Sequence, residues 1–356
     1  MSFQPKKPSP VGRGSASNPH NRFEKLNLEL EPDAFVDEDG EPILQRTQFL
    51  RDDSQSVITF NDSPDIPFRA GLNAYRGCEH GCAYCFARPY HEYLGYSAGL
   101  DFETKIVVKE NAPELLRREL SKKSWQPQPI AMSGITDCYQ PVERRLQLTR
   151  RCLAVLAEFR NPVGIITKNH LVTRDLDHLA ELAVYRAAHV CVSLTTLDGA
   201  LAKTLEPRAS PPGRRLAAIE ELSAAGVPVI ALTAPIIPGL NDHEIPDLLA
   251  AAARAGARTA GYTLVRLPWA VAPLFTAWLE RHAPGHKDKV LGRIESMRGG
   301  RLNDPNFGSR MKGEGVLAEQ TKALFALAKR KAGFRGELPE LSAAAFRVPT
   351  AQLSLF

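Results

Sequence analysis

The sequence of 356 residues has no long hydrophobic run and few cysteines. None of its apolar runs approaches the roughly 18 residues that a membrane span requires, and its polar N-terminus is unlike a signal peptide. Six cysteines, three of them clustered, suit a reducing compartment better than the disulfide framework of secreted domains. These absences argue against a membrane protein or a disulfide-stabilised protein, and they predict a cytoplasmic location.

Excess charge is also small overall, with a formal net charge of +5 at pH 7. The local exception lies between Gly285 and Gly336, where twelve Lys and Arg residues stand against five Asp and Glu residues. Such an excess can serve phosphate contact. The alternative is a pair of solvated helices with cationic faces, and the sequence leaves both interpretations open.

Composition divides the chain into five segments. Residues 1–25 are rich in Pro, Ser, Gly, Asn and Lys, and we expect them to be disordered. Residues 26–70 are turn-rich and are expected to wrap the core, which spans 71–267. A basic helical appendage is expected at 268–336, and 337–356 is expected to form a flexible tail.

Within the core segment, short apolar runs alternate with segments of helical periodicity. This order is typical of βαβ units and a parallel sheet, and an apolar content of 44% is enough to bury a large core. Strands are predicted at 72–76, 129–133, 163–167, 188–194, 227–233 and 259–264. Helices are predicted at 111–121, 143–159, 174–185, 213–225 and 243–255, and in the appendage at 269–283, 286–298 and 313–331.

The chain carries its most informative motif at residues 78–85, CEHGCAYC. Cys78, Cys82 and Cys85 place three thiols on one short loop, and cysteine thiolates are the ligands of iron–sulfur clusters. Structural metal sites are normally closed by four ligands, but here His80 lies inside the loop and the next cysteine is Cys138. The motif therefore predicts a [4Fe–4S] cluster with one open iron, and the alternative is a zinc knuckle or scattered structural cysteines.

This spacing resembles the signature of the radical S-adenosylmethionine (radical SAM) enzymes, in which the methionine end of SAM chelates the open iron. The wider run from Leu72 to Arg88, LNAYRG through YCFAR, resembles the branch that includes spore photoproduct lyase and DNA repair photolyase-like proteins. The resemblance covers about residues 55–265, and its motifs are specific for the cofactors but not for the substrate.

The resemblance implies a [4Fe–4S] cluster and SAM as cofactors. One electron from the cluster would cleave SAM to methionine and a 5′-deoxyadenosyl radical, so a one-electron reductant such as flavodoxin or ferredoxin is an expected partner. The implied fold is α/β, a partial (β/α)6 TIM-like barrel of radical SAM type with a helical C-terminal appendage. In such barrels the chemistry sits at the C-terminal ends of the strands.

The same resemblance assigns residues after the predicted strands to SAM. The turn Ser133-Gly134-Ile135-Thr136-Asp137 would receive the methionine ammonium, although it departs from the family's Gly-Gly-Glu pattern. Gly134 would let the backbone approach, and Thr136 and Asp137 would supply a hydroxyl and a carboxylate. The alternative for Asp137 is an N-cap of the next helix.

Other residues complete the predicted SAM site. Lys168 would face the SAM carboxylate, and the alternative is a lysine that is simply solvated. Ser193 would bind the ribose, and the alternative is a buried hydroxyl whose hydrogen bonds are made within the core. Glu206 and Arg208 lie in a Glu-Pro-Arg segment, and the guanidinium of Arg208 could bind a carboxylate or a phosphate through two parallel hydrogen bonds. Ala234 would lie along the adenine, and Tyr84 would contact the adenine through its ring or its backbone.

A hydrogen donor is needed to quench the radical, and spore photoproduct lyase uses a cysteine just before the matching turn Asp. Gly134 stands at the approximate equivalent here. Cys138 falls on the other side of Asp137, so it cannot simply inherit the role, and Tyr139 is a second candidate for a radical relay. The alternative is that Cys138, Cys152 and Cys191 are buried small hydrophobes. This departure argues against spore photoproduct lyase activity proper.

The last five residues, Gln352-Leu353-Ser354-Leu355-Phe356, resemble the consensus with which bacterial polymerases and repair proteins bind the β sliding clamp. Leu355 and Phe356 would anchor in an apolar pocket, and Gln352 would supply a directional hydrogen bond. The alternative is an apolar C-terminus that folds back on the core.

Three functions are compatible with these patterns. The first is a radical SAM enzyme acting on DNA, reversing a base lesion and recruited by the sliding clamp. The second keeps the radical chemistry but acts on RNA, a protein or a small molecule. The third is a non-catalytic iron–sulfur protein that binds nucleic acid, and the open iron argues against it.

Overall fold

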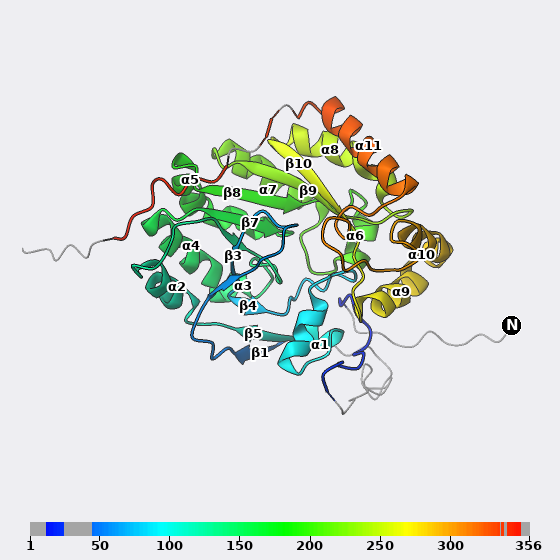
Figure 1. The fold of residues 1–356 in the computed structure, drawn as a ribbon, viewed down its shortest axis with the longest axis horizontal. Helices are drawn as coiled ribbons and strands as arrows, with labels where there is room; N and C mark the ends of the chain where they lie inside the picture. The colour runs from blue at the N-terminus through cyan, green and yellow to red at the C-terminus, as the bar shows by residue number, and fades with distance from the viewer. Residues whose placement is uncertain (1–11, 25–44, 335, 338–339, 350–356) are drawn as a thin grey trace, which may run out of the picture.

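A seven-stranded sheet runs through the centre of the molecule (Figure 1). The structure, a computed structural model, describes residues 12–24, 45–334, 336–337 and 340–349. Six strands in the order β10-β9-β8-β7-β6-β3 are parallel, and β2 pairs with β3 as an antiparallel edge strand. Their bounds are β2 Ile58–Phe60, β3 Ala70–Leu72, β6 Ile130–Met132, β7 Val163–Thr167, β8 Ala188–Ser193, β9 Val229–Ile236 and β10 Thr259–Leu264.

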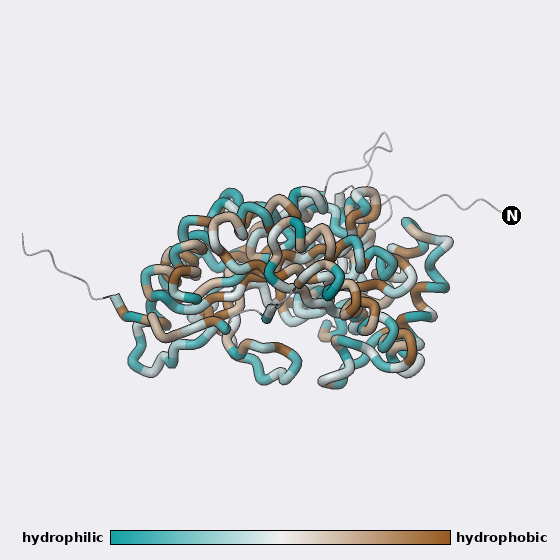
Figure 2. Tube along the Cα trace, turned by 90° about the horizontal axis from the view of Figure 1, so that it is seen from above, coloured by the Kyte–Doolittle hydropathy of each residue, from teal (hydrophilic) through white to brown (hydrophobic). Residues whose placement is uncertain are grey.

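Helices connect these strands and cover the sheet, as the alternating pattern predicts (Figure 1). The strands β7 and β8 are buried along almost their whole length, which is expected for parallel strands covered on both faces. In Figure 2 the hydrophobic stretches concentrate along the middle of the molecule. The helices of this layer are α2 Ala112–Leu120, α3 Glu143–Leu146, α4 Leu148–Phe159, α5 Leu176–Val184, α6 Gly199–Leu205, α7 Pro212–Ala224 and α8 Ile245–Arg254, with 3-10 turns η3 His170–Asp175 and η4 Asp242–Glu244.

Local backbone features explain where these helices differ from the predicted ones. The predicted helix 143–159 is two helices, because Gln147 between α3 and α4 adopts a left-handed φ of 53°. The predicted helix 174–185 begins as the 3-10 turn η3 and becomes α-helical at Leu176. The short helix α6 was not predicted; it begins at Asp198, whose carboxylate accepts hydrogen bonds from two following backbone N–H groups.

A second, three-stranded sheet contains β1 Gln48–Arg51, β5 Lys105–Val108 and β4 Tyr75–Arg76. The prediction of one strand over 72–76 was wrong, because the chain leaves the main sheet after Leu72 and joins β5 at Tyr75. The 3-10 helix η2 Arg88–Leu94 and the helix α1 Leu100–Thr104 lie between β4 and β5 in the sequence. This excursion carries the cysteine motif.

The N-terminal residues 12–24 lie against the core, so the prediction of disorder was wrong for this part of the segment. The backbone N–H groups of Gly14 and Ser15 donate to the carboxylate of Glu103, at 3.0 and 2.8 Å. A Cβ atom on Gly14 would lie 1.7 Å from the carbonyl oxygen of Gly81, so only glycine fits there. The segment therefore packs directly on the back of the cysteine loop.

After β10 the chain forms α9 Val271–His282, the 3-10 turn η5 Pro284–His286, α10 Lys287–Ser296 and α11 Val316–Lys331. The ring of Phe325 on α11 lies 4.6 Å from that of Tyr262 on β10, and the ammonium of Lys329 donates to the carbonyl of Ala260 at 2.8 Å. Thus α11 covers the last strand of the barrel, while α9 and α10 pack on each other beside it (Figure 1). Of the predicted appendage, α11 therefore belongs to the helices that cover the sheet, and α9 and α10 lie in the segment between β10 and α11.

The described part of the predicted tail, residues 340–349, runs back along the molecule. The backbone N–H groups of Ser342 and Arg347 donate to the carbonyls of Arg186 and Phe159, both at 2.9 Å. The prediction of a flexible tail was therefore wrong for 340–349, and the pentapeptide 352–356 lies outside the described residues. None of the helices in the described ranges combines the length and the apolar character needed to cross a membrane.

Candidate functional site

A pocket of about 130 Å³ lies at the C-terminal ends of β6, β7 and β8, and all three motif cysteines line it. We call it the cysteine pocket. Cys78 and Cys82 are buried and Cys85 is partly exposed. The predicted SAM-binding residues that line the same pocket are Ser133, Gly134, Thr136, Asp137, Lys168 and Ser193. Residues from four separate parts of the sequence therefore meet at the strand ends, as in other parallel barrels.

The three thiols form a donor set that suits an iron–sulfur cluster. Burial raises the pKa of both Cys82 and Cys85, so the free side chains are neutral thiols, and a bound metal would be needed to hold them as thiolates. Over the described ranges, no three His, Cys, Asp or Glu side chains are grouped to hold one metal ion. A cluster does not need such a group, because each thiolate binds a different iron.

A fully buried ion pair, Arg88–Glu103, holds the cysteine loop from behind. The guanidinium of Arg88 donates to the carbonyls of Cys82 at 2.9 Å and Gly81 at 3.3 Å, and to the Glu103 carboxylate at 2.6 Å. Both side chains are 0% exposed. Neither residue has a role predicted from the sequence, where the one signal is an arginine three residues after Cys85. Both are positioning residues for the loop.

Asp137 links the cysteine loop to the sheet. Its carboxylate accepts hydrogen bonds from the Thr167 hydroxyl and the Lys168 backbone N–H, both at 2.8 Å, and lies 3.3 Å from Nδ1 of His80. Burial alone would raise the pKa of Asp137, but His80 and the backbone N–H groups of Lys168 and Tyr139 hold it at about 2. Asp137 does not cap a helix, since the N-cap of α3 is Val142. Its carboxylate orients the loop rather than standing open for a ligand.

The neighbouring turn residues also make internal bonds. The Thr136 hydroxyl donates to the carbonyl of Gly77 at 2.6 Å, and the Ser133 hydroxyl accepts from the backbone N–H of Cys138 at 2.9 Å. Ser133 has a left-handed φ of 83°, which a non-glycine residue rarely adopts and which clusters at functional sites. A Cβ atom on Gly134 would meet nothing closer than 3.8 Å, so the turn has open space at that point.

Lys168 and Ser193 are the polar side chains least engaged by the protein in this pocket. The Lys168 ammonium lies 5.9 Å from the Tyr84 ring centroid and forms no ion pair within the described ranges. Ser193 is buried at the end of β8. A cation and a hydroxyl therefore face a pocket whose remaining polar groups are mostly satisfied.

The model of the family described as the radical SAM superfamily matches residues 72–252. This chain belongs to the radical SAM superfamily. An uncharacterized protein of Mycobacterium tuberculosis (strain ATCC 25618 / H37Rv) is 36% identical over 281 residues, which is 78% of this chain and 80% of that protein. An uncharacterized protein of Methanocaldococcus jannaschii is 32% identical over 173 residues, 49% of this chain and 62% of that protein.

Solved structures of spore photoproduct lyase share the fold. The structure complexed with dinucleoside spore photoproduct has a TM-score of 0.58 at 13% identity, covering 80% of this chain and 79% of that one. A cysteine-to-serine mutant of spore photoproduct lyase has a TM-score of 0.59 at 14% identity, covering 88% and 86%. The predicted fold class, a partial barrel of radical SAM type, is confirmed. So are the predicted cofactors of this radical SAM enzyme, a [4Fe–4S] cluster and SAM, which the cysteine pocket fits.

Four predicted SAM residues, Tyr84, Glu206, Arg208 and Ala234, lie outside the lining of the cysteine pocket, and all but Arg208 belong to one hydrogen-bond network. The Tyr84 hydroxyl and the Arg215 guanidinium both donate to the carboxylate of Glu206, and the Thr195 hydroxyl does so at 2.6 Å. Burial opposes ionisation, but Arg215 and Lys168 hold the pKa of Glu206 at about 2. The carbonyl of Ala234 accepts from the same Thr195 hydroxyl at 3.3 Å. This network braces the strand ends beside the radical SAM site.

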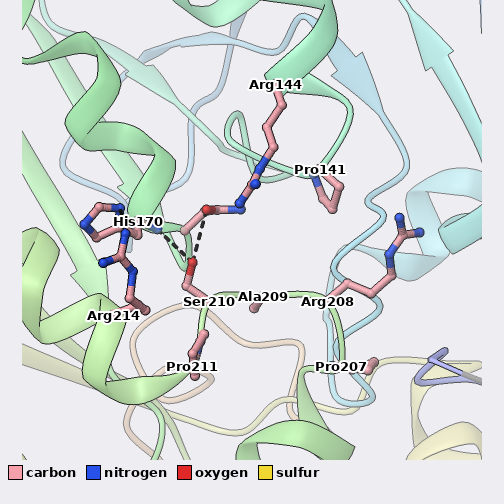
Figure 3. Close-up of a pocket in the computed structure, with 10 residues that line it drawn as sticks. Pro141, Arg144, His170, Pro207, Arg208, Ala209, Ser210, Pro211 and Arg214 are labelled. Carbon is pink, nitrogen blue, oxygen red and sulfur yellow. Dashed lines mark hydrogen bonds between the residues drawn. The ribbon is translucent and has the colours of Figure 1, made fainter.

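Arg208 lines a different and larger cavity, of about 570 Å³, together with His170 and Ser210 (Figure 3). We call it the arginine cavity. Arg144, Arg208 and Arg214 line it, and none of the Asp or Glu residues that the structure describes does. Arg208 pairs with Glu79 at 3.1 Å, and its backbone N–H donates to the His80 carbonyl at 3.3 Å. The structure does not bring Arg208 to the cysteine pocket.

The two residues predicted to relay a radical also lie outside the pocket lining. Cys138 is buried in the main hydrophobic core. Tyr139 is fully buried, and its hydroxyl donates to Asp175 at 3.1 Å. Both side chains therefore serve the core in this arrangement, as does Cys152.

Proposed function

We propose that this radical SAM enzyme acts in DNA repair, on a damaged base. The observation that carries the proposal is the meeting of three cysteines with Lys168 and Ser193 in one pocket at the strand ends. When bound, the [4Fe–4S] cluster supplies the electron that cleaves SAM to methionine and a 5′-deoxyadenosyl radical. A one-electron donor such as flavodoxin or ferredoxin and a cytoplasmic location belong to the same proposal.

The protein's own groups bind and orient the cofactor. The Lys168 ammonium, which forms no ion pair among the described residues, pairs with the SAM carboxylate, and Ser193 at the end of β8 binds the ribose. The turn at Ser133 and Gly134 lines the pocket and has open space at Gly134, and it would receive the methionine ammonium. Asp137 and Arg88 hold the cysteine loop in register with the sheet.

Action on DNA is supported by two observations. Spore photoproduct lyase, whose fold this chain shares, has been solved with a dinucleoside spore photoproduct. The segment between Gly285 and Gly336 is strongly basic, and basic surfaces contact nucleic-acid phosphates. Fold alone does not define substrate, so the choice between DNA and other substrates depends on experiment.

The test is anaerobic SAM cleavage. The reconstituted and reduced enzyme is mixed with SAM, and 5′-deoxyadenosine is quantified with no DNA, with undamaged DNA, and with UV-irradiated or alkylated DNA. Stimulation by damaged over undamaged DNA is expected. Cleavage that ignores DNA would move the substrate to RNA, a protein or a small molecule, and an intact reduced cluster without cleavage would favour a non-catalytic iron–sulfur protein.

Recruitment by the β sliding clamp is a separate part of the proposal and rests on the sequence of residues 352–356 alone. Deletion of these five residues should abolish co-elution with purified clamp and leave SAM cleavage unchanged. A chain carrying Phe356→Leu keeps an apolar end and serves as a graded control. Equal clamp retention by the deleted chain would refute this part.

A further inference from the structure

Five aromatic rings stand exposed beside the cysteine pocket. They are Phe23, Phe86, Tyr90, Tyr93 and Trp269, and we call them the aromatic surface; Tyr93 and Trp269 are each 66% exposed. Phe86 follows Cys85 directly and lines the cysteine pocket itself. The surface therefore begins at the site of the chemistry and extends away from it.

Ring contacts connect the outer part of this surface. The rings of Phe23 and Tyr93 are 4.8 Å apart, and those of Tyr90 and Tyr93 are 6.4 Å apart. The Arg22 guanidinium lies 4.0 Å from the centroid of Trp269 and 4.6 Å from that of Phe23. Residues from the N-terminal segment, from η2 and from the loop after β10 thus form one continuous patch.

Trp269 is held in an unusual backbone conformation. It lies between β10 and α9 in the sequence, with a left-handed φ of 43°. A bulky residue in this region is strained, and such strain is kept where surrounding structure enforces it, often at functional sites. The strain is not offset by burial, because the indole projects largely into solvent. An exposed, strained tryptophan beside other exposed rings indicates a binding surface.

Arg266 joins this surface to the pocket and forms no ion pair among the described residues. Its guanidinium lies 5.6 Å from the Phe86 ring and near enough to Tyr90 to interact electrostatically. Its Nε has no hydrogen-bond partner, and its Nη1 contacts the sulfur of Met311 at 3.7 Å. Two carboxylates act on it electrostatically, but both have other partners: Asp65 pairs with Arg310, and Asp304 accepts from the Ser309 hydroxyl.

We propose that the aromatic surface binds an unpaired nucleic-acid strand, with bases stacked on its rings and a phosphate on Arg266, and that Phe86 passes the reactive nucleotide to the cysteine pocket. The choice of a nucleic acid rests on the proposed function. Aromatic rings interleaved with arginines are the usual means of holding single strands, because every base has a face that stacks and every nucleotide carries a phosphate.

The experiment is a binding measurement that requires no radical chemistry. Fluorescence anisotropy under anaerobic conditions compares the reconstituted protein with a labelled DNA single strand of about 15 nucleotides, its RNA counterpart and the same DNA as a duplex. Tighter binding of a single strand than of the duplex is expected, and the DNA and RNA arms identify which strand is preferred. Trp269→Ala and Tyr93→Ala should each weaken binding about tenfold. Arg266→Gln should lower the slope of log affinity against log salt by about one.

The matched control is Phe49→Ala, which removes another exposed ring with an arginine 4.8 Å away, on β1 of the other sheet. It should bind like the wild type. Equal binding by Trp269→Ala and Tyr93→Ala, or duplex bound as tightly as single strand, would overturn the proposal. SAM cleavage by each variant without nucleic acid is measured in parallel. A variant that keeps SAM cleavage but loses strand binding has its defect in the aromatic surface. If the wild type itself does not cleave SAM, the radical chemistry is refuted, and the binding data still decide whether the aromatic surface holds a single strand.

Discussion

The substitution Glu103→Gln tests how the cysteine loop is held. Glu103 accepts hydrogen bonds from Arg88 and from the backbone N–H groups of Gly14 and Ser15. A glutamine would leave the fully buried Arg88 charge uncompensated and would point an amide N–H at one of the backbone donors. Breaking a buried pair on one side costs about 3–5 kcal/mol, so we expect the free energy of unfolding of the cluster-free chain to fall by that amount.

The same change should loosen the loop that carries the cluster ligands. Arg88 anchors the carbonyls of Gly81 and Cys82, so an Arg88 that shifts toward water releases both. We expect urea unfolding to report the stability loss, and iron and sulfide analysis after reconstitution to show less than half of the wild-type content. Because all three cysteines are unchanged in this variant, a lower iron content would come from the position of the loop and not from a missing ligand.

A matched control is Glu158→Gln, which breaks the Arg117–Glu158 pair. Both of those side chains are more than a third exposed, and exposed pairs contribute about 0–1 kcal/mol. This variant should therefore keep its stability within about 1 kcal/mol and incorporate the cluster fully. Wild-type stability and iron content in Glu103→Gln would refute the reasoning that the Arg88–Glu103 pair positions the loop.

Three further predictions follow from the site. Cys82→Ala should abolish cluster assembly, measured as iron per chain, whereas Cys152→Ala, in the core, should not. A wild-type iron content in the Cys82→Ala variant would refute the assignment of Cys82 as a cluster ligand. Lys168→Met should raise the dissociation constant for SAM about tenfold or more with iron content unchanged, and calorimetric titration that finds wild-type affinity would exclude this lysine from the SAM site. The pKa of Glu206 is about 2 against a usual 4.5. Its contribution to stability is therefore complete above about pH 4.5 and is lost as pH falls toward 2. The slope of unfolding free energy with pH between about 4.5 and 3 should be smaller by up to about 1.4 kcal/mol per pH unit in Glu206→Gln, and equal slopes would contradict the lowered pKa.

The parts of the fold that could be predicted depend on local patterns. Parallel strands such as β7 and β8 are continuous apolar runs, and the three cysteines lie within eight residues, so both could be recognised from the sequence. The split of the predicted strand 72–76 could not, because Tyr75 pairs with Val108, far along the chain. The sequence contains no local signal for which partner a short strand chooses.

The roles of individual polar residues were harder to predict, because they depend on contacts between distant segments. Asp137 was expected to face SAM, but its carboxylate is taken by His80 and by donors at the end of β7. The order of residues 12–24 depends on Glu103, a buried acceptor that no periodicity reveals. The polar composition of residues 12–24 indicated disorder. Composition carries no information about a buried carboxylate elsewhere in the chain that accepts hydrogen bonds from this backbone.

The position of α11 has a consequence for how this enzyme can evolve. The chain leaves the barrel at Leu264, and the backbone N–H of Leu264 donates to the carbonyl of Met311 at 3.0 Å, just before α11 returns to cover β10. The ends of the intervening segment are thus neighbours, and such sites tolerate insertion and exchange of whole elements. Residues 265–315 include Arg266 and Trp269, but on their inner side Val265, Leu267 and Val271 pack in one buried cluster with Cys82 and Tyr84 of the cysteine loop. New substrates can therefore be acquired by changing the exposed positions of this segment, while its inner side must keep packing against the loop that holds the cofactor.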